Sequence, residues 1–465
     1  MPVTSPSPSD RENPVGRDRG DACPGALRLH GADDGALARI RLPGGLLTAR
    51  QAESLAGLAH ELGDGNLDLT SRGNVQLRGL APDCGAELGA RLRAAGLLPS
   101  DRHDRVRNVA ASPLCGLDDR RPTADVQAWT RELDRLLCGA DPEPPTRTAD
   151  LSGLPDLSQL SGRFLFGLDD GRGDITALAP DVTLIAEANG SALLCYAATG
   201  PCLRLAAADA PRAAALAARH FLDGLRARGL TAWRVGDLPP QDRPDTGLLR
   251  RRLAAAGITA APGGLLPPPA APPEPGCVHG PGGRTALSVA APLGRLTTAQ
   301  WLLLAHGAAQ AGDGTLRVTP WRGVVLPGLP AREAVPRLTA LAAAGLVTSP
   351  ASAWHGAGAC AGHPGCAKSR ADVRADATAC LTSVRPAPAP EHRGTASALP
   401  VYWSGCERRC GHPGGRWVDV LATGDGYRVA VRDGAREESA RTVPAARSAD
   451  AVAAARATGP AGDAT

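Results

Sequence analysis

Lysine and aromatic residues are scarce in this 465-residue sequence, which has a single lysine, Lys368, and 3% aromatic residues. Because arginine replaces lysine throughout, an individual arginine is weak evidence of function. The net charge of +4 is small for this length, and no basic patch is interleaved with aromatic residues, which argues against a nucleic-acid partner. No apolar run approaches the ~20 residues of a membrane span, so we expect no membrane partner.

The N-terminal residues 1–21 lack the apolar core of a secretory signal, and we expect a disordered, polar leader on a cytoplasmic protein. Twelve cysteines in a reducing compartment are more often free thiols or metal ligands than disulfides. Eight of them are isolated in the sequence, and we interpret these as buried small hydrophobic residues: Cys23, Cys84, Cys115, Cys138, Cys195, Cys202, Cys277 and Cys380.

The sequence contains an internal repeat. Residues 43–100 align without a gap to residues 292–349, with 23 identities in 58 positions at a constant offset of 249. The most similar stretch is "GDGNLDLTSRGNVQLRGL" in the first copy and "GDGTLRVTPWRGVVLPGL" in the second. Arg72 in the first copy faces Trp321 in the second. A duplication for stability alone gives no reason for this divergence, so we expect the copies to differ in function.

The residue pattern of the repeat unit predicts its secondary structure. "LARIRL" alternates as a half-buried strand does, and Thr48 with Gln51 has the spacing of a helix capping box, as has Thr297 with Gln300. "NLDLT" and "NVQLRG" predict two strands joined by a tight turn, "DCGAELGARLRAAG" a second helix and "RVRNVA" a last strand. The order β-α-β-β-α-β is that of a ferredoxin-like unit, and two units are expected to pair about a pseudo-two-fold axis.

The remaining sequence predicts two further α/β regions. "RFLFGLDD", "DVTLIAEA" and "SALLCYAA" predict strands of the first, and "WVDVLATGDGYRVAVRDG" a hairpin of the second. The expected division is a leader at 1–21, ferredoxin-like half-domain 1 at 22–105, α/β domain 1 at 106–262, a Pro-rich linker at 263–278, half-domain 2 at 279–350, α/β domain 2 at 351–435 and an Ala-rich, partly disordered tail at 436–465.

The strongest chemical signal is a pair of cysteine motifs. Cys360 and Cys366 have the spacing C-x5-C, and Cys406 and Cys410 the spacing C-x3-C. Four thiolates in two close pairs can hold the four corners of one iron–sulfur cluster, [4Fe–4S]. Structural zinc usually has C-x2-C to C-x4-C spacing and is the runner-up, and four unrelated buried cysteines are the third interpretation. The flanking His363 and His412 more simply bond backbone carbonyls or lie at the surface.

These features resemble the sulfite/nitrite reductase superfamily over residues 22–435, and within it "CPGALRLHGADDGALARIRLPGG" and "DLTSRGNVQLRGL" are most similar to the precorrin-3B synthase family. The resemblance implies an α+β (α/β) fold, in which two ferredoxin-like half-domains are joined by two α/β domains that carry the cluster and a tetrapyrrole. It also implies that Cys360, Cys366, Cys406 and Cys410 bind [4Fe–4S], the last of them bridging to siroheme in the reductases.

The resemblance also implies substrate-binding residues. Arg72 falls on an arginine that contacts the bound anion or tetrapyrrole, and Arg107 on a second family arginine. Arg163 falls where the reductases have the first of two active-site lysines, and Leu165 where they have the second. Leu165 removes a proton donor and a charge, which disfavours the reduction of sulfite or nitrite. A polycarboxylate substrate is still served by the three arginines.

The implied activity is oxygen-dependent conversion of precorrin-3A to precorrin-3B, by hydroxylation at C20 and lactone formation in aerobic cobalamin biosynthesis. The implied partners are precorrin-3A, O2 and an electron donor, either reduced ferredoxin or an NAD(P)H-linked protein. Because four cysteines fill the cluster's coordination, O2 activation needs an additional iron centre, either non-haem iron or a siroheme-like haem. No catalytic residue is identified. The alternatives are a siroheme-dependent sulfite or nitrite reductase and a non-catalytic electron carrier or tetrapyrrole-binding protein.

Overall fold

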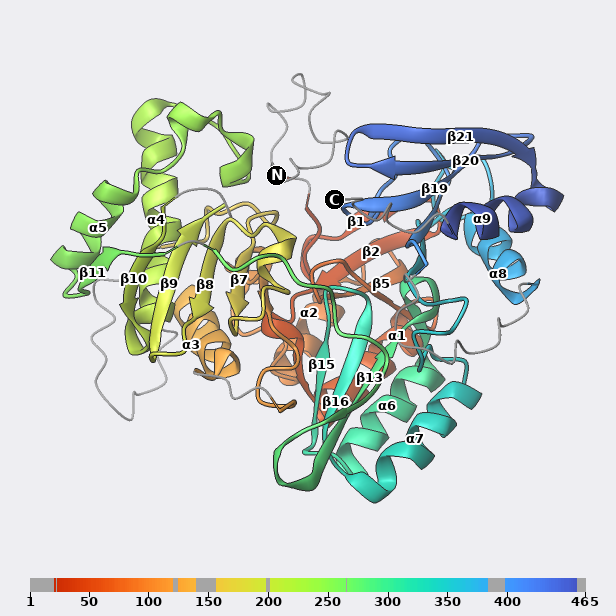
Figure 1. The fold of residues 1–465 in the computed structure, drawn as a ribbon, viewed down its shortest axis with the longest axis horizontal. Helices are drawn as coiled ribbons and strands as arrows, with labels where there is room; N and C mark the ends of the chain where they lie inside the picture. The colour runs from red at the N-terminus through yellow and green to blue at the C-terminus, as the bar shows by residue number, and fades with distance from the viewer. Residues whose placement is uncertain are drawn as a thin grey trace, which may run out of the picture.

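The computed structural model describes residues 21, 23–119, 124–138, 156–197, 201–264, 266–383 and 398–457. The predicted leader therefore lies outside the described residues except for Asp21. Within the described part the strands form four sheets. Figure 1 shows a six-stranded sheet on the left and the C-terminal sheet at the upper right, with the two half-domains between and below them. No helix in the described ranges is long and apolar enough to cross a membrane.

Each half-domain is built on a five-stranded antiparallel sheet. The strand order is β1-β2-β5-β4-β14 in the first and β12-β13-β16-β15-β3 in the second. The strands are β1 (His30–Ala32), β2 (Gly35–Ile40), β3 (Leu46–Thr48), β4 (Asn66–Leu69), β5 (Val75–Leu80), β12 (Gly276–His279), β13 (Arg284–Ala290), β14 (Arg295–Thr297), β15 (Thr315–Val318) and β16 (Gly323–Pro330).

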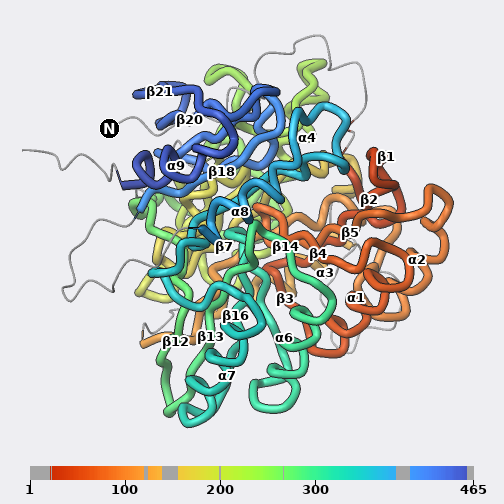
Figure 2. Tube along the Cα trace, turned by 90° about the vertical axis from the view of Figure 1, so that its right-hand side faces the viewer, coloured from red at the N-terminus to blue at the C-terminus, as the bar shows by residue number. Residues whose placement is uncertain are grey.

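Each of these sheets takes its last strand from the other half-domain. β14 pairs with β4, placing Leu296 opposite Leu67, and β3 pairs with β15, placing Leu47 opposite Leu316. These two pairs of residues are related by the repeat offset, so the exchange is reciprocal. Figure 2 shows β3, β4 and β14 together at the centre of the molecule. The exchange confirms the pseudo-two-fold arrangement predicted from the repeat.

The capping boxes predicted from the repeat are present in both half-domains. Helices α1 (Ala49–Leu62) and α6 (Thr298–Gln310) each begin after the predicted threonine. Thr48 Oγ1 accepts a hydrogen bond of 3.2 Å from Gln51 N, and Thr297 Oγ1 accepts one of 3.2 Å from Gln300 N. Together with α2 (Gly85–Ala94) and α7 (Ala331–Ala343), these helices cover the two sheets, and apolar residues of both half-domains form one core.

The last predicted strand of the first unit, in "RVRNVA", lies elsewhere. This strand, β6 (Val109–Ala111), pairs in parallel with β7 (Phe166–Asp169) in the six-stranded sheet. In a ferredoxin-like unit a fourth strand would lie beside the first, but β1 occupies that edge of β2. The unit therefore passes its last strand to the following domain.

The first α/β domain is the six-stranded sheet, with the order β11-β10-β9-β8-β7-β6. The three predicted strands correspond to β7, β8 (Val182–Ala186) and β9 (Ser191–Tyr196). The other elements are α3 (Val126–Cys138), β10 (Leu203–Ala206), α4 (Ala210–Arg228), α5 (Thr246–Ala255) and β11 (Ala260–Pro262). β6, β7 and β8 are parallel, and the remaining strands are antiparallel.

The C-terminal sheet has the order β17-β18-β19-β20-β21 and includes the predicted hairpin as β19 and β20. Its elements are β17 (Ala357–Ala359), α8 (Val373–Ser383), β18 (Val401–Ser404), β19 (Arg416–Ala422), β20 (Gly426–Asp433), β21 (Arg436–Pro444) and α9 (Ser448–Arg456). The expected tail from residue 436 is therefore ordered through α9, because β21 pairs with β20 and Val452 of α9 packs in the core of this domain. The end of the predicted linker at 263–278 is likewise ordered, because strand β12 begins at Gly276.

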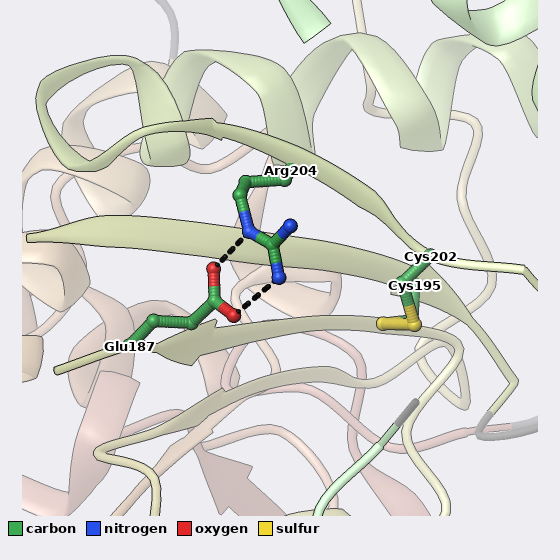
Figure 3. Close-up of a disulfide and its surroundings, with 4 residues drawn as sticks. All are labelled: Glu187, Cys195, Cys202 and Arg204. Atoms are coloured by element: carbon green, nitrogen blue, oxygen red, sulfur yellow. Dashed lines mark hydrogen bonds and ion pairs between the residues drawn. A yellow bond between two sulfur atoms is a disulfide. The ribbon is translucent and has the colours of Figure 1, made fainter. Parts of the chain in front are cut away.

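Two of the cysteines interpreted as isolated hydrophobic residues are bonded to each other. Cys195 at the end of β9 and Cys202 before β10 form a disulfide, beside an ion pair between Arg204 and Glu187 (Figure 3). The interpretation of this pair as free thiols is wrong: β9 and β10 are antiparallel neighbours, and this pairing brings the two residues together. Cys23, Cys115 and Cys380 are buried free thiols as expected, whereas Cys84, Cys138 and Cys277 are half-buried.

Candidate functional site

Two loops at one edge of the C-terminal sheet carry the predicted cluster cysteines. Cys360 follows β17 directly and Cys366 lies before α8, whereas Cys406 and Cys410 follow β18. Because β17 and β18 are neighbouring parallel strands, both loops leave the sheet at the same edge. The backbone N–H of Gly405 donates a hydrogen bond of 3.2 Å to Cys360 Sγ, which joins the two loops.

The four thiols lie within electrostatic reach of one another. Burial raises the pKa of Cys360, and the neighbouring Cys406 and Cys366 raise it further. Burial also raises the pKa of Cys410, and the other three cysteines add to the increase. None of the four forms a disulfide. Their charges would therefore repel as thiolates unless a bound cationic centre compensated them.

The spacing of these thiols fits a cluster better than a single zinc ion. Four sulfurs on one zinc lie about 3.8 Å apart, given a Zn–S bond of about 2.3 Å. Among the described residues, the one group of three or more candidate ligand atoms within 4.8 Å of one another is Asp169, Asp170 and Asp174. No three of the four cysteines therefore have sulfur atoms as close together as a zinc site requires. Four thiols at wider spacing are the donor set of a [4Fe–4S] cluster.

The first half-domain holds the loop that contains Cys366. Arg78 Nη2 on β5 donates a hydrogen bond of 2.8 Å to the carbonyl oxygen of Gly365. The same guanidinium forms a bidentate ion pair with Asp34, with both bonds at 2.8 Å. Arg374 Nε on α8 donates a bond of 3.1 Å to the carbonyl oxygen of Cys360. The loop position therefore depends on the half-domain.

The second half-domain holds the loop that contains Cys410. Arg322, in the turn between β15 and β16, donates a hydrogen bond of 2.7 Å from Nη2 to the carbonyl oxygen of Gly411. Its guanidinium carbon lies 5.7 Å from the ring centroid of Tyr402. The Tyr402 hydroxyl donates a bond of 2.7 Å to the carbonyl oxygen of Cys410. The turn that carries Trp321 is thus also the support of the second cysteine pair.

The two histidines beside the cysteines have ordinary surroundings. His412 Nδ1 lies 2.7 Å from the carbonyl oxygen of Pro413, and the ring stacks on Trp417 with centroids 5.0 Å apart. His363 is exposed. These positions confirm the interpretation that they bond backbone carbonyls or lie at the surface.

Arg72 lies in the turn between β4 and β5, where Thr70 Oγ1 accepts hydrogen bonds from the backbone N–H groups of Arg72 and Asn74. Among the described residues its guanidinium has no hydrogen-bond partner. Burial, together with the smaller effects of the charges of Arg234 and Arg41, lowers the pKa of Arg72 to about 10. The equivalent turn of the second half-domain is adjacent, because a Cβ on Gly73 would lie 3.1 Å from the carbonyl oxygen of Val318.

Three further arginines lie near the predicted binding arginines: Arg234 and Arg41 act on Arg72, and Arg39 acts on Arg41 and Arg163. Arg41 is 1% exposed and donates hydrogen bonds of 3.2 Å to Cys23 Sγ and 3.0 Å to the carbonyl oxygen of Gly162. Arg39 also donates to Cys23 Sγ, at 3.6 Å. The sequence could have predicted that Arg39 and Arg41 lie together, because alternate residues of a strand share one face. The third, Arg234, lies in an irregular segment, where no motif or periodic pattern in the sequence indicates its position. We refer to Arg39, Arg41, Arg72, Arg163 and Arg234 as the arginine group.

Positive charge exceeds negative charge around Arg72. Asp181, which is buried, pairs with Arg234 through a bond of 3.0 Å between Asp181 Oδ2 and Arg234 Nε. At Arg72, repulsion from Arg234 and Arg41 exceeds the opposing effects of Asp181 and Cys23 on its pKa. An anion bound here would therefore be stabilised by charge as well as by hydrogen bonds.

Arg163 and Leu165 lie at the edge of this group with different surroundings. The guanidinium carbon of Arg163 lies 4.4 Å from the ring centroid of Trp233, a cation–π contact. Leu165 is buried in a small apolar cluster with Ile175, against which Trp321 of the second half-domain packs. The tryptophan of the second repeat copy therefore contributes an apolar wall beside the position where the family reductases have a lysine.

Arg107 does not join the arginine group. It is 5% exposed, and its Nε and Nη2 each donate a hydrogen bond of 2.7 Å to the carboxylate of Asp134 on α3. Its Nη1 donates to the carbonyl oxygen of Leu97 at 3.1 Å. These bonds hold the Arg107 guanidinium in place, and its predicted role in binding the substrate stays a prediction.

The acidic group after β7 was also not selected from the sequence. Asp169 accepts hydrogen bonds from the backbone N–H groups of Gly171, Gly173, Ile175 and Thr176. Asp170 forms a bidentate ion pair with Arg172. These bonds shape the loop itself, and they account for two of the three carboxylates without a metal ion.

Comparison with known proteins shows that both copies of the repeat are similar to a known half-domain. Both copies match the family model described as the nitrite/sulfite reductase ferredoxin-like half domain, over residues 30–95 and 278–344. A ferredoxin–nitrite reductase of Synechococcus elongatus is 27% identical over 404 residues, which cover 81% of this chain and 74% of the relative. A precorrin-3B synthase of a Sinorhizobium species is 24% identical over 424 residues, which cover 90% of this chain and 84% of the relative.

The fold is also similar to that of a solved structure. The structure of the NirA protein of Mycobacterium tuberculosis superposes with a TM-score of 0.64 at 19% identity, covering 89% of this chain and 79% of that one. The chain therefore contains two segments that match this half-domain model, and its fold is similar to that of the NirA protein.

Proposed function

We propose that the protein is a cytoplasmic monooxygenase of the precorrin-3B synthase type, which converts precorrin-3A to precorrin-3B with O2 and a reductant. The observation that carries this proposal is the excess of positive charge around Arg72, beside the buried Leu165. Guanidinium groups bind carboxylates through paired hydrogen bonds, which suits a tetrapyrrole with many carboxylates. Leucine at the position of the second reductase lysine offers no proton for reducing a small anion.

The four cysteines supply the electron-transfer part of the proposal. Cys360, Cys366, Cys406 and Cys410 would hold a [4Fe–4S] cluster, which when bound supplies electrons one at a time. The electrons would come from reduced ferredoxin or an NAD(P)H-linked protein. Oxygen activation requires a further iron centre, non-haem iron or a siroheme-like haem, because the four thiolates complete the coordination of the cluster.

The residues of this chain bind and orient the substrate. Arg72 and Arg163 would hold carboxylates of the macrocycle, and the remaining charge of the arginine group would favour the substrate's negative charge. Leu165 and Trp321 form an apolar wall that excludes water from that side. In the overall reaction one oxygen atom enters the substrate at C20 and an acetate side chain closes a lactone. The other oxygen atom leaves as water, with two electrons and two protons from the reductant.

A second function, ferredoxin-dependent reduction of nitrite or sulfite, is favoured by a different observation. The nitrite reductase relative of Synechococcus elongatus covers most of this chain, and Arg72 and Arg163 also suit a small anion. In that function the cysteine loops would support a siroheme as well as the cluster, with reduced ferredoxin as the donor.

Anaerobic purification followed by iron, sulfide and haem analysis separates these functions. The protein is then incubated with precorrin-3A, O2 and a reductant, and the products are analysed by mass spectrometry. A product one oxygen atom heavier than precorrin-3A supports the proposal. Siroheme absorption together with nitrite or sulfite reduction would replace it with the second function. A cluster without either activity would indicate an electron carrier or a tetrapyrrole-binding protein.

A further inference from the structure

The irregular segment after α4 brings two side chains to the arginine group. Trp233 covers the guanidinium of Arg163 at 4.4 Å. Among the charged groups near Arg72, Arg234 has the largest effect on the pKa of Arg72. It lowers this pKa, although by less than burial does. Two adjacent residues of one segment therefore contact or influence the two arginines that the proposed function places on the substrate.

Asp181 fixes this segment to the strand that follows Arg163. Its buried carboxylate accepts hydrogen bonds of 2.8 Å from Leu165 N, 2.7 Å from Val235 N and 3.0 Å from Arg234 Nε. The segment is also closed on itself, because Asp237 Oδ2 accepts bonds of 3.1 Å from Trp233 N and 2.9 Å from Arg234 N. Such multiple anchoring fixes side chains to the precision that a binding site requires.

The contacts of Arg234 leave donors for a ligand. Its Nε is bonded to Asp181, and its Nη2 donates a bond of 2.7 Å to the carbonyl oxygen of Ala179. A guanidinium has five N–H donors, so these two bonds do not exhaust it. Two carboxylates act on Arg234, Arg72 and Arg41: Asp181 on the first two and Asp104 on the third. The three positive charges still outnumber them.

We propose that Trp233 and Arg234 form a second wall of the substrate site, in which Arg234 binds a substrate carboxylate and Trp233 positions Arg163. Asp181 is the positioning residue that anchors this wall. The inference rests on the proposed function only for the class of ligand, a macrocycle that bears several carboxylates. Its geometry comes from the contacts above.

Binding of uroporphyrin III, an octacarboxylate probe, to the purified cluster-containing protein tests the role of Arg234. Arg234→Gln is expected to weaken binding by about tenfold, because a charge-assisted hydrogen bond is lost, and to reduce the dependence of binding on salt. Arg234→Lys keeps a cation beside Asp181 but not the planar donor fork, so it is expected to weaken binding by a smaller factor. Arg226→Gln on the exposed side of α4 is the matched control and should bind as the wild type does.

A double-mutant cycle tests the role of Trp233. If Trp233 acts by positioning Arg163, Trp233→Ala weakens binding in the wild type but has no further effect in the Arg163→Gln variant. Additive effects of the two substitutions would refute this role. Trp233→Phe retains a ring and should recover much of the affinity. Urea unfolding and the cluster absorption show whether each variant is folded.

The inference and the proposed function fail in different ways. Unchanged uroporphyrin binding and salt dependence in both Arg234 variants would overturn the second wall, even if the wild type hydroxylates precorrin-3A. Conversely, weakened probe binding in these variants would support the wall even if the wild type yields no hydroxylated product, which would overturn the proposed reaction alone.

Discussion

Trp301 Nε1 on α6 donates a hydrogen bond of 2.8 Å to the carbonyl oxygen of Ala52 on α1. Residues 52 and 301 are equivalent positions of the repeat, related by its offset of 249. A residue that contacts its own equivalent lies at the pseudo-two-fold axis. Tryptophan has the largest side chain and alanine one of the smallest, and together they fill this position. Two tryptophans would overfill it, and two alanines would leave a void.

Trp301→Ala is expected to lower the free energy of unfolding by about 3–5 kcal/mol, because it opens a cavity in the core that both half-domains share. Urea unfolding measures the change. Leu303→Ala on the same helix, where the side chain is 38% exposed, should cost less than about 1 kcal/mol. Similar costs for the two variants would contradict a shared core centred on Trp301.

Local spacing was sufficient to predict most helices and strands. The capping boxes of α1 and α6 could be read because both partners lie within one turn of chain. Long-range pairing could not be read in this way. The exchange of β3 and β14 joins strands that lie in opposite halves of the sequence, and an alternating pattern indicates a strand but not its partner. The transfer of β6 follows from the presence of β1, a strand of three residues with no periodic signal.

The same distinction holds at the site. The spacing of Cys360, Cys366, Cys406 and Cys410 is visible in the sequence, and adjacent parallel strands bring the pairs together. Arg234 was missed because its position depends on Asp181, which is 53 residues away in the sequence. Arg107 was selected by motif alone, and only the structure shows Asp134 occupying its guanidinium.

Cys406→Ser is expected to abolish the visible absorption of the proposed cluster, because serine replaces one of its four proposed thiolate ligands. Cys380→Ala should retain it. Cys380 is buried in the core of the same domain, where burial raises the pKa of its thiol to about 11 and keeps it protonated. Absorption spectra and iron content of the two purified variants provide the measurement. Retention of a full cluster in the Cys406 variant would refute the ligand assignment.

Arg78→Met should speed the loss of the cluster in air and lower the free energy of unfolding by about 2 kcal/mol. The substitution removes the bonds to Gly365 and leaves Asp34 without its cation. Arg91→Met is the control, since the pair of Arg91 with Glu61 is exposed and such pairs contribute little. Bleaching at the cluster's visible band gives the rate, and equal rates in both variants would contradict support of the loop by Arg78.

The disulfide predicts a stability that depends on reductant. Cys195 and Cys202 are separated by 7 residues in the sequence, and closing such a loop stabilises a protein by about 2.5 kcal/mol in the chain-entropy estimate. Reductant should lower the free energy of unfolding by up to about this amount, but have no such effect on a variant with both cysteines replaced by alanine. Alkylation without prior reduction, followed by mass spectrometry, should leave these two cysteines unmodified. Their complete alkylation would contradict the bond.

Asp174 predicts a dependence of stability on pH. Burial, and then the neighbouring charge of Asp169, raise its pKa to about 7, although a hydrogen bond from Ser112 opposes them. In the unfolded chain an aspartate has a pKa near ~3.9. Between these two pKa values, Asp174 therefore binds a proton in the folded state but not in the unfolded state. The stabilising contribution of Asp174 is full at low pH and is lost as the pH rises through about 7.

Comparison with Asp174→Asn isolates this effect from the other carboxylates. The stability of the variant relative to the wild type should rise between pH 4 and pH 8, by up to about 4 kcal/mol for a shift of about three pKa units. Asp156→Asn provides a control, because hydrogen bonds from Ser158 lower the pKa of Asp156. Its titration therefore lies almost wholly below this pH range, and the stability difference of this variant should change little between pH 4 and pH 8. Urea unfolding across this pH range gives both differences. A constant difference for Asp174→Asn would mean that this carboxyl group keeps its ordinary pKa, and that the unpartnered Oδ2 atom of Asp174 carries no proton at neutral pH.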